Sequence, residues 1–326
     1  ALPISFEENI TASKICRVLK SIDGMKVISG FAMPTCVIGI LGEDIPGPAL
    51  MFRASMDALA VEEETGLSYT SCIPGVMHAC GHDAHMASLL GAAKVLSRHK
   101  SELKHRIVFL FQPAAEGRGG AKTLIENMFL EKFDIGCCIC LNWLSELPYS
   151  ELYMRRGVLT ALSDRIHIDI RGVAGHAAEP HMAVDPVTIA AHIIIAMQTM
   201  LSRDVDPRDP VVVSFGQVEA GIAYNAIPEQ AHLWGTLRAF TPKTRDFVQS
   251  RIETLAPAIA KAFRGLASVE YTRNYGQVEN DPALVDTVTK IGEPFFGEDG
   301  INMLERPLLS GEDFSFFSSC VPSVFM

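Results

Sequence analysis

The stretch R-I-V-F-L-F-Q at residues 106–112 is a short, nearly continuous apolar run that leads into a glycine-rich turn. A run of this length and composition predicts a buried strand. Other apolar runs alternate with longer amphipathic segments on both sides of it. Strands are expected at residues 36–41, 49–54 and 135–141, and helices at 81–96 and 122–130. Because strands that alternate with helices favour parallel pairing, the pattern predicts an α/β domain with a mainly parallel sheet flanked by helices.

The pattern changes near residue 163. Residues 165–170 alternate polar and apolar side chains, which is typical of a strand with one exposed face. The segments that follow have the order β-α-β-β-α-β of a ferredoxin-like unit. We therefore expect an inserted α+β domain at residues 163–275, and a first domain made of residues 1–162 and 276–326.

Composition and charge exclude several classes of function. The 326 residues carry 28 Lys and Arg against 38 Asp and Glu, a formal net charge of −10. An acidic chain without a basic cluster is a poor candidate for binding nucleic acid or an anionic membrane. No apolar run approaches the roughly 20 residues that a membrane-spanning helix needs.

The cysteines indicate a reducing compartment. Eight of them have irregular spacings, and three fall within residues 137–140. Successive strand residues point to opposite faces, so these three are a poor set for disulfides. The cytoplasm is therefore the expected location.

Both ends of the chain resemble interior segments. Residue 1 is Ala rather than Met, and a predicted helix begins almost at once. The sequence stops at Val324-Phe325-Met326, an apolar run typical of a buried strand. We expect both ends of a longer protein to be missing, so the sequence does not exclude a targeting segment.

The segment M-H-A-C-G-H-D-A-H at residues 77–85 holds the densest group of ligand-type side chains. Thiolate, imidazole and carboxylate together are the ligand set of zinc and related metals. Cys80 and His82 are the strongest candidates. The segment leads into a predicted helix, whose N-terminus should help to keep Cys80 as a thiolate. His78 and His85 have a simpler explanation as ordinary residues of a helix end.

Two carboxylates follow predicted strands. Asp57 comes after the strand that ends at Ala54, and Glu116 comes after the strand that ends at Gln112. Sites in open α/β sheets gather at the carboxyl ends of strands. Each carboxylate alone is weak evidence, because most such groups only cap the next helix.

The inserted domain offers a third group of polar residues. His176 and His181 lie in a loop before a predicted helix, and Asn225 and Arg238 flank a predicted strand. Arg is suited to bidentate binding of a carboxylate. Considered singly, each of the four is better explained as a surface ion pair or a turn residue.

Taken together, these motifs resemble the zinc-dependent amidohydrolase/peptidase family that includes aminoacylases, hippurate hydrolases and indoleacetyl-amino-acid hydrolases. They occur in order and span nearly the whole chain. The matching segments are M-H-A-C-G-H-D-A-H at 77–85, F-Q-P-A-A-E-G at 111–117, G-H-A-A-E-P-H at 175–181, N-A-I-P-E at 225–229, G-T-L-R-A-F at 235–240 and S-G-E-D-F-S at 310–315.

The resemblance implies a catalytic domain that holds two divalent metal ions, zinc or manganese. It implies hydrolysis of the amide bond of an N-acyl amino acid or a small peptide by metal-activated water. By this resemblance Cys80, His82 and Glu116 are metal ligands. Asp57 matches the carboxylate that orients one of the ligands.

The same resemblance makes the inserted domain a lid through which two copies of the chain form a homodimer. His176 matches a lid histidine that stabilises the oxyanion, often from the partner subunit. Asn225 and Arg238 match groups that hold the substrate carboxylate, and His181 is expected with the substrate-binding residues.

The sequence departs from the family pattern at the site itself. The usual Glu-Glu pair is Ala115-Glu116 here, so a methyl group replaces the general base. Leu141 stands where a histidine ligand is usual, and Ser55 stands where Asp is usual. The family's last histidine ligand lies beyond residue 326. Three of five expected ligands remain, which suffices for one catalytic zinc and is thin support for two.

Two functions are therefore open. The chain is either a metal-dependent amidohydrolase, or a catalytically impaired homologue that binds carboxylate ligands or serves as a scaffold without turnover. The fold does not separate them, because function resides in the site.

Overall fold

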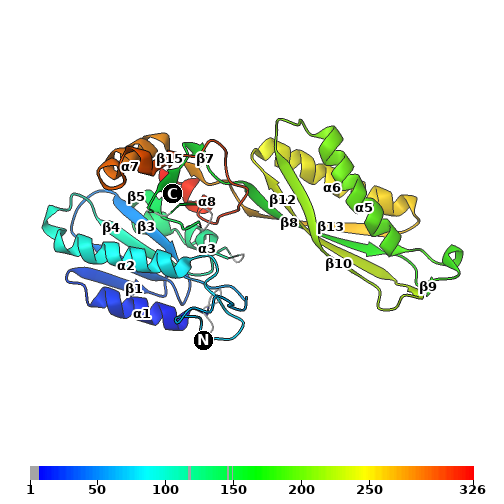
Figure 1. Ribbon diagram of the computed structural model, residues 1–326, viewed down its shortest axis with the longest axis horizontal. Coiled ribbons are helices and arrows are strands. Elements are labelled where there is room, and N and C mark those ends of the chain that lie inside the picture. The colour runs from blue at the N-terminus through cyan, green and yellow to red at the C-terminus, as the bar shows by residue number, and fades with distance from the viewer. Residues whose placement is uncertain (1–6, 117–118, 145–146, 149) are drawn as a thin grey trace. The chain divides into compact units, whose positions relative to one another are not determined.

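The strand predicted at residues 106–112 lies inside a six-stranded sheet of strand order β1-β2-β4-β3-β5-β16. The computed structural model describes residues 7–116, 119–144, 147–148 and 150–326 (Figure 1). The strands of this sheet are β1 (Met25–Ser29), β2 (Val37–Leu41), β3 (Ala49–Ser55), β4 (Ile107–Gln112), β5 (Ile135–Cys140) and β16 (Ser323–Phe325).

The sheet is parallel on one side of β4 and antiparallel on the other. β4 pairs parallel with β3, β3 with β5, and β5 with β16, whereas the β1–β2 and β2–β4 pairs are antiparallel. The connection between β1 and β2 is too short for the crossover that parallel strands need. The prediction of an α/β unit with a mainly parallel sheet is confirmed, and the antiparallel edge is a feature that the sequence did not indicate.

Helices cover both faces of this sheet. They are α1 (Asn9–Lys20), α2 (His82–Arg98), α3 (Gly120–Glu126), α4 (Phe129–Lys132), α7 (Pro282–Phe296) and α8 (Ser315–Ser318). Along β4, Phe109 belongs to the core beneath α1 and α2, while Leu110 belongs to the core beneath α3 and α4. Because successive strand residues point to opposite faces, a strand buried on both sides has the continuous apolar run seen here.

The helix expected at residues 122–130 is interrupted. The structure has two helices there, because Met128 adopts a left-handed backbone with φ of 58° between α3 and α4. Five strands of the first unit were not predicted from the sequence patterns. They are β1 and the short strands β6 (Leu152–Met154), β7 (Gly157–Val158), β14 (Glu279–Asn280) and β15 (Ile301–Met303).

By their contacts the residues fall into two units. The first unit contains Ala1–Leu159, Val278–Pro307 and Glu312–Met326, and the second contains Thr160–Gln277 with Leu308–Gly311. The second unit thus interrupts the first in sequence. Its short segment at Leu308–Gly311 lies far from the rest in sequence, and no local pattern indicated it.

The second unit is a four-stranded antiparallel sheet with two helices. The strand order is β10-β12-β8-β13, and the chain order is β-α-β-β-α-β. Its main elements are β8 (Leu162–Arg171), α5 (Pro186–Asp204), β10 (Val211–Ala220), β12 (Gln230–Ala239), α6 (Pro242–Ala262) and β13 (Leu266–Tyr275). Ile166, Ile168 and Ile170 of β8 are buried in one core with residues of α5 and α6. The intervening residues of β8 therefore lie on the sheet face that the two helices leave open.

In the described ranges no helix is both long enough and apolar enough to cross a membrane. The eight cysteines are all free thiols.

Candidate metal centre

The candidate residues of the first unit lie on loops at the carboxyl ends of its parallel strands. Asp57 follows β3, Glu116 follows β4, and Cys80 lies just before α2, which begins at His82. Because parallel strands end at the same edge of a sheet, residues far apart in sequence meet there. The structure therefore brings Asp57, Cys80, His82 and Glu116 together, as the following contacts show.

His82 is held in place by Asp57. Its Nδ1 lies 2.8 Å from the Asp57 carbonyl oxygen and 3.2 Å from Asp57 Oδ1, and its Nε2 lies 3.7 Å from Glu116 Oε1. The backbone N–H of Glu116 donates to Asp57 Oδ2 at 2.9 Å. Through these contacts Asp57 raises the pKa of His82 against the effect of burial. The arrangement leaves Nε2 as the imidazole nitrogen that is directed at Glu116.

The Cys80 thiol is protonated in this arrangement. Burial, a hydrogen bond to the Glu116 side chain and the nearby carboxylate of Asp57 raise the pKa of Cys80 to about 12. These effects act against the thiolate that the sequence predicts, so a metal ion that binds Cys80 would have to displace the proton.

Positions 115 and 141 carry hydrocarbon side chains. Ala115 is buried, and Leu141 is 36% exposed just after β5. Neither can bind a metal or accept a proton. The next residues, Asn142 and Trp143, reach α2 instead, because the Trp143 N–H donates to His85 Nε2 at 3.3 Å.

His78 and His85 have buried nitrogens that the sequence did not single out. Among the described residues, neither His78 Nδ1 nor His85 Nδ1 has a hydrogen-bond partner. Burial lowers the pKa of His85 to about 3, which keeps its imidazole neutral. Because Nε2 of the neutral ring accepts from the Trp143 N–H, the ring proton lies on Nδ1, and His85 packs beside His82 with ring centroids 5.2 Å apart.

A buried polar network lies beneath the site and was missed at the sequence level. Asp313 accepts hydrogen bonds from Arg53, from Gln112 Nε2 at 2.5 Å and from the Ala121 N–H at 3.0 Å. Its neighbour Glu312 lies 3.3 Å from Arg53 Nη2 and also helps to raise the pKa of Cys80. Their segment, S-G-E-D-F-S, carried the family resemblance, but nothing local indicated what the two acids contact.

The second unit brings two of its four candidate residues together. His176 pairs in β9 (Gly175–His176) with Ala226 in β11 (Ala226–Ile227), and the Ala177 N–H donates to the Asn225 carbonyl at 3.1 Å. His176, Asn225 and His181 are exposed.

Arg238 lies at the other end of the sheet. It pairs with Ser163 at the start of β8, whereas β9 follows the end of β8 at Arg171. Eight residues of strand separate these ends, which is roughly 26 Å at the usual rise per residue. Figure 1 shows β9 beyond one end of the four-stranded sheet. Within one chain, Arg238 and the pair formed by His176 and Asn225 are not brought together.

The thiol, imidazole and carboxylate of Cys80, His82 and Glu116 are suitable ligands for a divalent ion, but their ligand atoms lie too far apart to share one. Among the described residues, three or more ligand atoms of His, Cys, Asp and Glu lie within 4.8 Å of one another only at His167, Asp169 and His232 of the second unit. Cys80, His82 and Glu116 would therefore move closer to bind an ion. The carboxylate that holds Nδ1 of His82 is nonetheless the usual support of a metal-binding histidine.

Comparison with known proteins tests the family resemblance. Residues 51–326 match the family described as Peptidase family M20/M25/M40. The chain is 35% identical over 325 residues to an IAA-amino acid hydrolase of Arabidopsis thaliana. This match covers 98% of this chain and 72% of the hydrolase. It is also 36% identical over 321 residues to a hippurate hydrolase of Campylobacter jejuni. That match covers 96% of this chain and 81% of the hippurate hydrolase.

A solved structure gives the same answer. A Bacillus subtilis protein described as a dinuclear metal-binding peptidase of this family superposes with a TM-score of 0.81 and 30% sequence identity, over 99% of this chain and 83% of that chain. The resemblance predicted from the sequence motifs is confirmed. The chain belongs to Peptidase family M20/M25/M40.

Proposed function

We propose that this chain binds a divalent metal ion and hydrolyses the amide bond of N-acyl amino acids or small peptides. The observation that supports it most directly is the position of His82, whose Nδ1 is held by Asp57 while its Nε2 is directed at Glu116. Metal-binding histidines are usually oriented by a carboxylate or carbonyl at the other ring nitrogen. The relatives named as hydrolases of an amino-acid conjugate and of hippurate support this substrate class.

Cys80, His82 and Glu116 would hold the ion, with Asp57 fixing the ring of His82. Zinc and manganese both accept this mixed ligand set. When bound, the ion supplies Lewis acidity, which lowers the pKa of water toward neutrality and polarises an amide carbonyl. Two ions are expected from the family resemblance, but Leu141 contributes no ligand, so the described residues support one ion better than two.

Arg238 would bind the carboxylate of the substrate. Its Nη1 donates to Thr236 and to the Leu237 carbonyl at 2.9 Å, which fixes the guanidinium while other N–H groups remain. His176 and Asn225 lie roughly 26 Å from it along the sheet. A small substrate cannot touch both places in one chain. A homodimer in which the second unit acts as a lid, and in which the partner supplies His176 and Asn225, would resolve this distance.

A second candidate function is binding without turnover. It is favoured by Ala115, because a buried methyl group cannot act as the general base that the family pattern places there. In this case the chain would bind the metal ion and the substrate but would hydrolyse the substrate slowly or not at all.

The test combines metal content with hydrolysis. The full chain, saturated with zinc or manganese and freed of excess ion, would be compared with Cys80→Ser and with the matched control Cys72→Ser, an exposed free cysteine of the same loop region. We expect Cys80→Ser to lose bound metal and to lose hydrolysis of hippurate and N-acetyl amino acids. Cys72→Ser should keep both.

The outcomes separate the two functions. Unchanged metal content in Cys80→Ser would contradict the proposed centre. The second function, binding without turnover, predicts a different pair of results. Cys80→Ser would lose its metal, and the unaltered chain would bind N-acyl amino acids saturably without hydrolysing them.

A further inference from the structure

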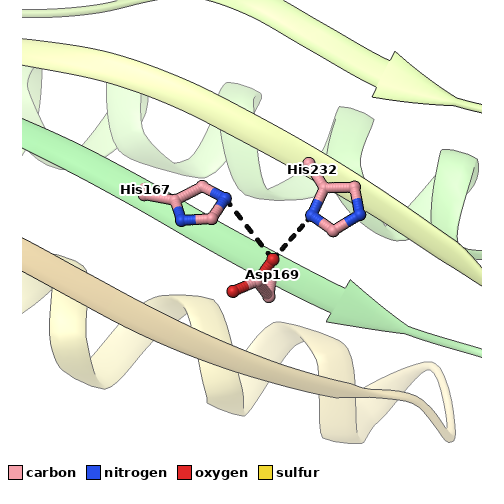
Figure 2. Close-up of side chains that lie close together, drawn as sticks. All are labelled: His167, Asp169 and His232. Carbon is pink, nitrogen blue, oxygen red and sulfur yellow. Dashed lines mark hydrogen bonds and ion pairs between the residues drawn. The ribbon is translucent and has the colours of Figure 1, made fainter.

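We propose that the open face of the second unit's sheet carries a separate site for a borderline divalent metal such as zinc, formed by His167, Asp169 and His232. His167 and Asp169 lie two positions apart on β8, and His232 on β12 pairs directly with Asp169. Alternate residues of a strand share a face, and paired residues lie side by side, so all three side chains meet on one surface. Figure 2 shows both imidazoles directed at the Asp169 carboxylate. The site is independent of the proposed catalytic function.

The distances suit a metal ion. His232 Nδ1 lies 2.6 Å and His167 Nε2 lies 3.4 Å from the same oxygen, Asp169 Oδ1. Ligand atoms that share a tetrahedral zinc ion at the usual bond lengths lie about 3.3 Å apart. The contact between His232 and Asp169 would have to open to this spacing, while all three ligand atoms already lie within 4.8 Å of one another.

His167 is set up to bind through Nε2. This atom is buried, and in the described part of the chain it has no hydrogen-bond partner. The other nitrogen, Nδ1, lies 3.7 Å from Glu270 Oε2 on the neighbouring strand β13. The ring stacks on Trp234 with centroids 4.9 Å apart and an angle of 8° between the planes. Glu270 thus lies near enough to supply, after a small movement, the outer carboxylate that commonly orients a metal-binding histidine.

The surroundings leave room for a further ligand. A cavity of about 230 Å³ lies beside His167 and is lined by Arg165, His167, Trp234, Glu270 and Thr272, whereas Asp169 and His232 do not line it. The side chains of His167, Asp169 and His232 are between 22% and 38% exposed. Two imidazoles and one carboxylate supply three ligands, and water would fill the fourth position of a tetrahedral ion. Imidazole donors favour zinc, cobalt, nickel or copper over magnesium or calcium.

The test measures Co²⁺ bound to the full chain. Equilibrium dialysis followed by elemental analysis would compare the unaltered chain, the double variant His167→Gln with His232→Gln, and the control His192→Gln, which alters an exposed histidine of α5. Each protein would be made both with Cys80 and with Cys80→Ser. The Co²⁺ bound at the proposed catalytic centre is then counted separately from the Co²⁺ bound at the second unit. We expect the double variant to hold one ion fewer per chain in both backgrounds, and His192→Gln to bind as the unaltered chain does.

Equal Co²⁺ content in the double variant and the unaltered chain would overturn the proposal. A second measurement decides the matter if the double variant does not fold. Paramagnetic broadening of the imidazole NMR signals of His167 and His232 by Co²⁺, with the signal of His192 unaffected, would support the site. Sharp signals from both at saturating Co²⁺ would refute it.

Discussion

Position 115 places a buried methyl group beside the candidate metal ligands. Ala115 directly precedes Glu116, whose backbone N–H is bound by Asp57. Asp57 cannot serve as a substitute base without giving up its contacts to His82. General base catalysis contributes about 10²–10⁴-fold to a rate, so its absence decides whether the chain turns over.

We predict that Ala115→Glu alone does not restore full turnover, because Leu141 still contributes no ligand. The double variant Ala115→Glu with Leu141→His should exceed the single variant by at least about 10-fold, because both carry the base and only the double variant adds an imidazole to the metal centre; about 10-fold is the lower end of what a lost partner of a metal ligand costs. The measurement is kcat/KM for hippurate with zinc or manganese in excess. A rate for the single variant that matches the hippurate hydrolase relative would contradict this account.

A second residue-scale prediction concerns Asp164, which is buried in the second unit. Burial raises its pKa, although the Tyr271 hydroxyl donates to Asp164 Oδ2 at 2.6 Å. A carboxyl group whose folded pKa lies above its unfolded value of about 3.9 favours folding when protonated. Its contribution is fully present below the unfolded pKa and is lost as the pH rises through the folded pKa.

Asp164→Asn removes this titration. We therefore expect the free energy of unfolding of the unaltered chain to fall, relative to Asp164→Asn, as the pH rises from about 4 toward neutrality. Urea unfolding at a series of pH values measures the difference. If the free energy of unfolding of the unaltered chain stays constant or rises with pH relative to that of Asp164→Asn, then folding does not raise the pKa of Asp164.

At the scale of elements, one buried carboxylate joins several segments of the first unit. Asp313 binds Arg53 of β3, Gln112 of β4 and the Ala121 N–H of α3. Arg53 and Asp313 are both almost completely buried. Because β3 and β4 end at the loops that carry Asp57 and Glu116, and α3 follows the second loop, the network fixes the strand ends on which the proposed site depends.

We expect Asp313→Ala to lower the free energy of unfolding by about 3 kcal/mol, the lower end of the cost of breaking a buried ion pair, because Glu312 still lies 3.3 Å from Arg53 Nη2. Asp286→Ala is the matched control, since Asp286 forms an exposed ion pair with Arg156. Its cost should stay below about 1 kcal/mol. Equal effects of the two substitutions in urea unfolding would mean that the Asp313 network does not stabilise the unit.

At the scale of the whole molecule, each of the two units has its own hydrophobic core. One core of the first unit contains Phe109 and α1 with α2, and the core of the second contains Leu233 and the residues of α5 and α6. Separate cores allow separate cooperative transitions, so unfolding of the chain need not be two-state.

We predict two transitions in calorimetry, of which only one responds to Leu233→Ala. This truncation of a fully buried side chain should destabilise the second unit by about 2–5 kcal/mol. Leu266→Ala makes the same change at a side chain that is 70% exposed, and it should shift neither transition measurably. A single transition that moves as a whole with Leu233→Ala would contradict independent unfolding.

The strands and helices of both units could be predicted largely from the sequence, because hydrophobic periodicity is a local property. The run at 106–112 and the alternation at 165–170 reflect burial on two faces and on one face respectively. The loop motif at 77–85 likewise places Cys80 and His82 within two positions, so the role that we propose for them could be inferred without a fold.

The antiparallel edge, the Asp313 network and the cluster of His167, Asp169 and His232 were decided only by the tertiary structure. Arg53 and Asp313 are 260 positions apart, and His232 meets Asp169 only through the pairing of β8 with β12. The separation of Arg238 from His176 likewise follows from the strand register. The sequence by itself determined the family and the alternation of strands and helices in each unit, whereas strand pairing decided which side chains meet, because register depends on contacts across the whole chain rather than on neighbours in sequence.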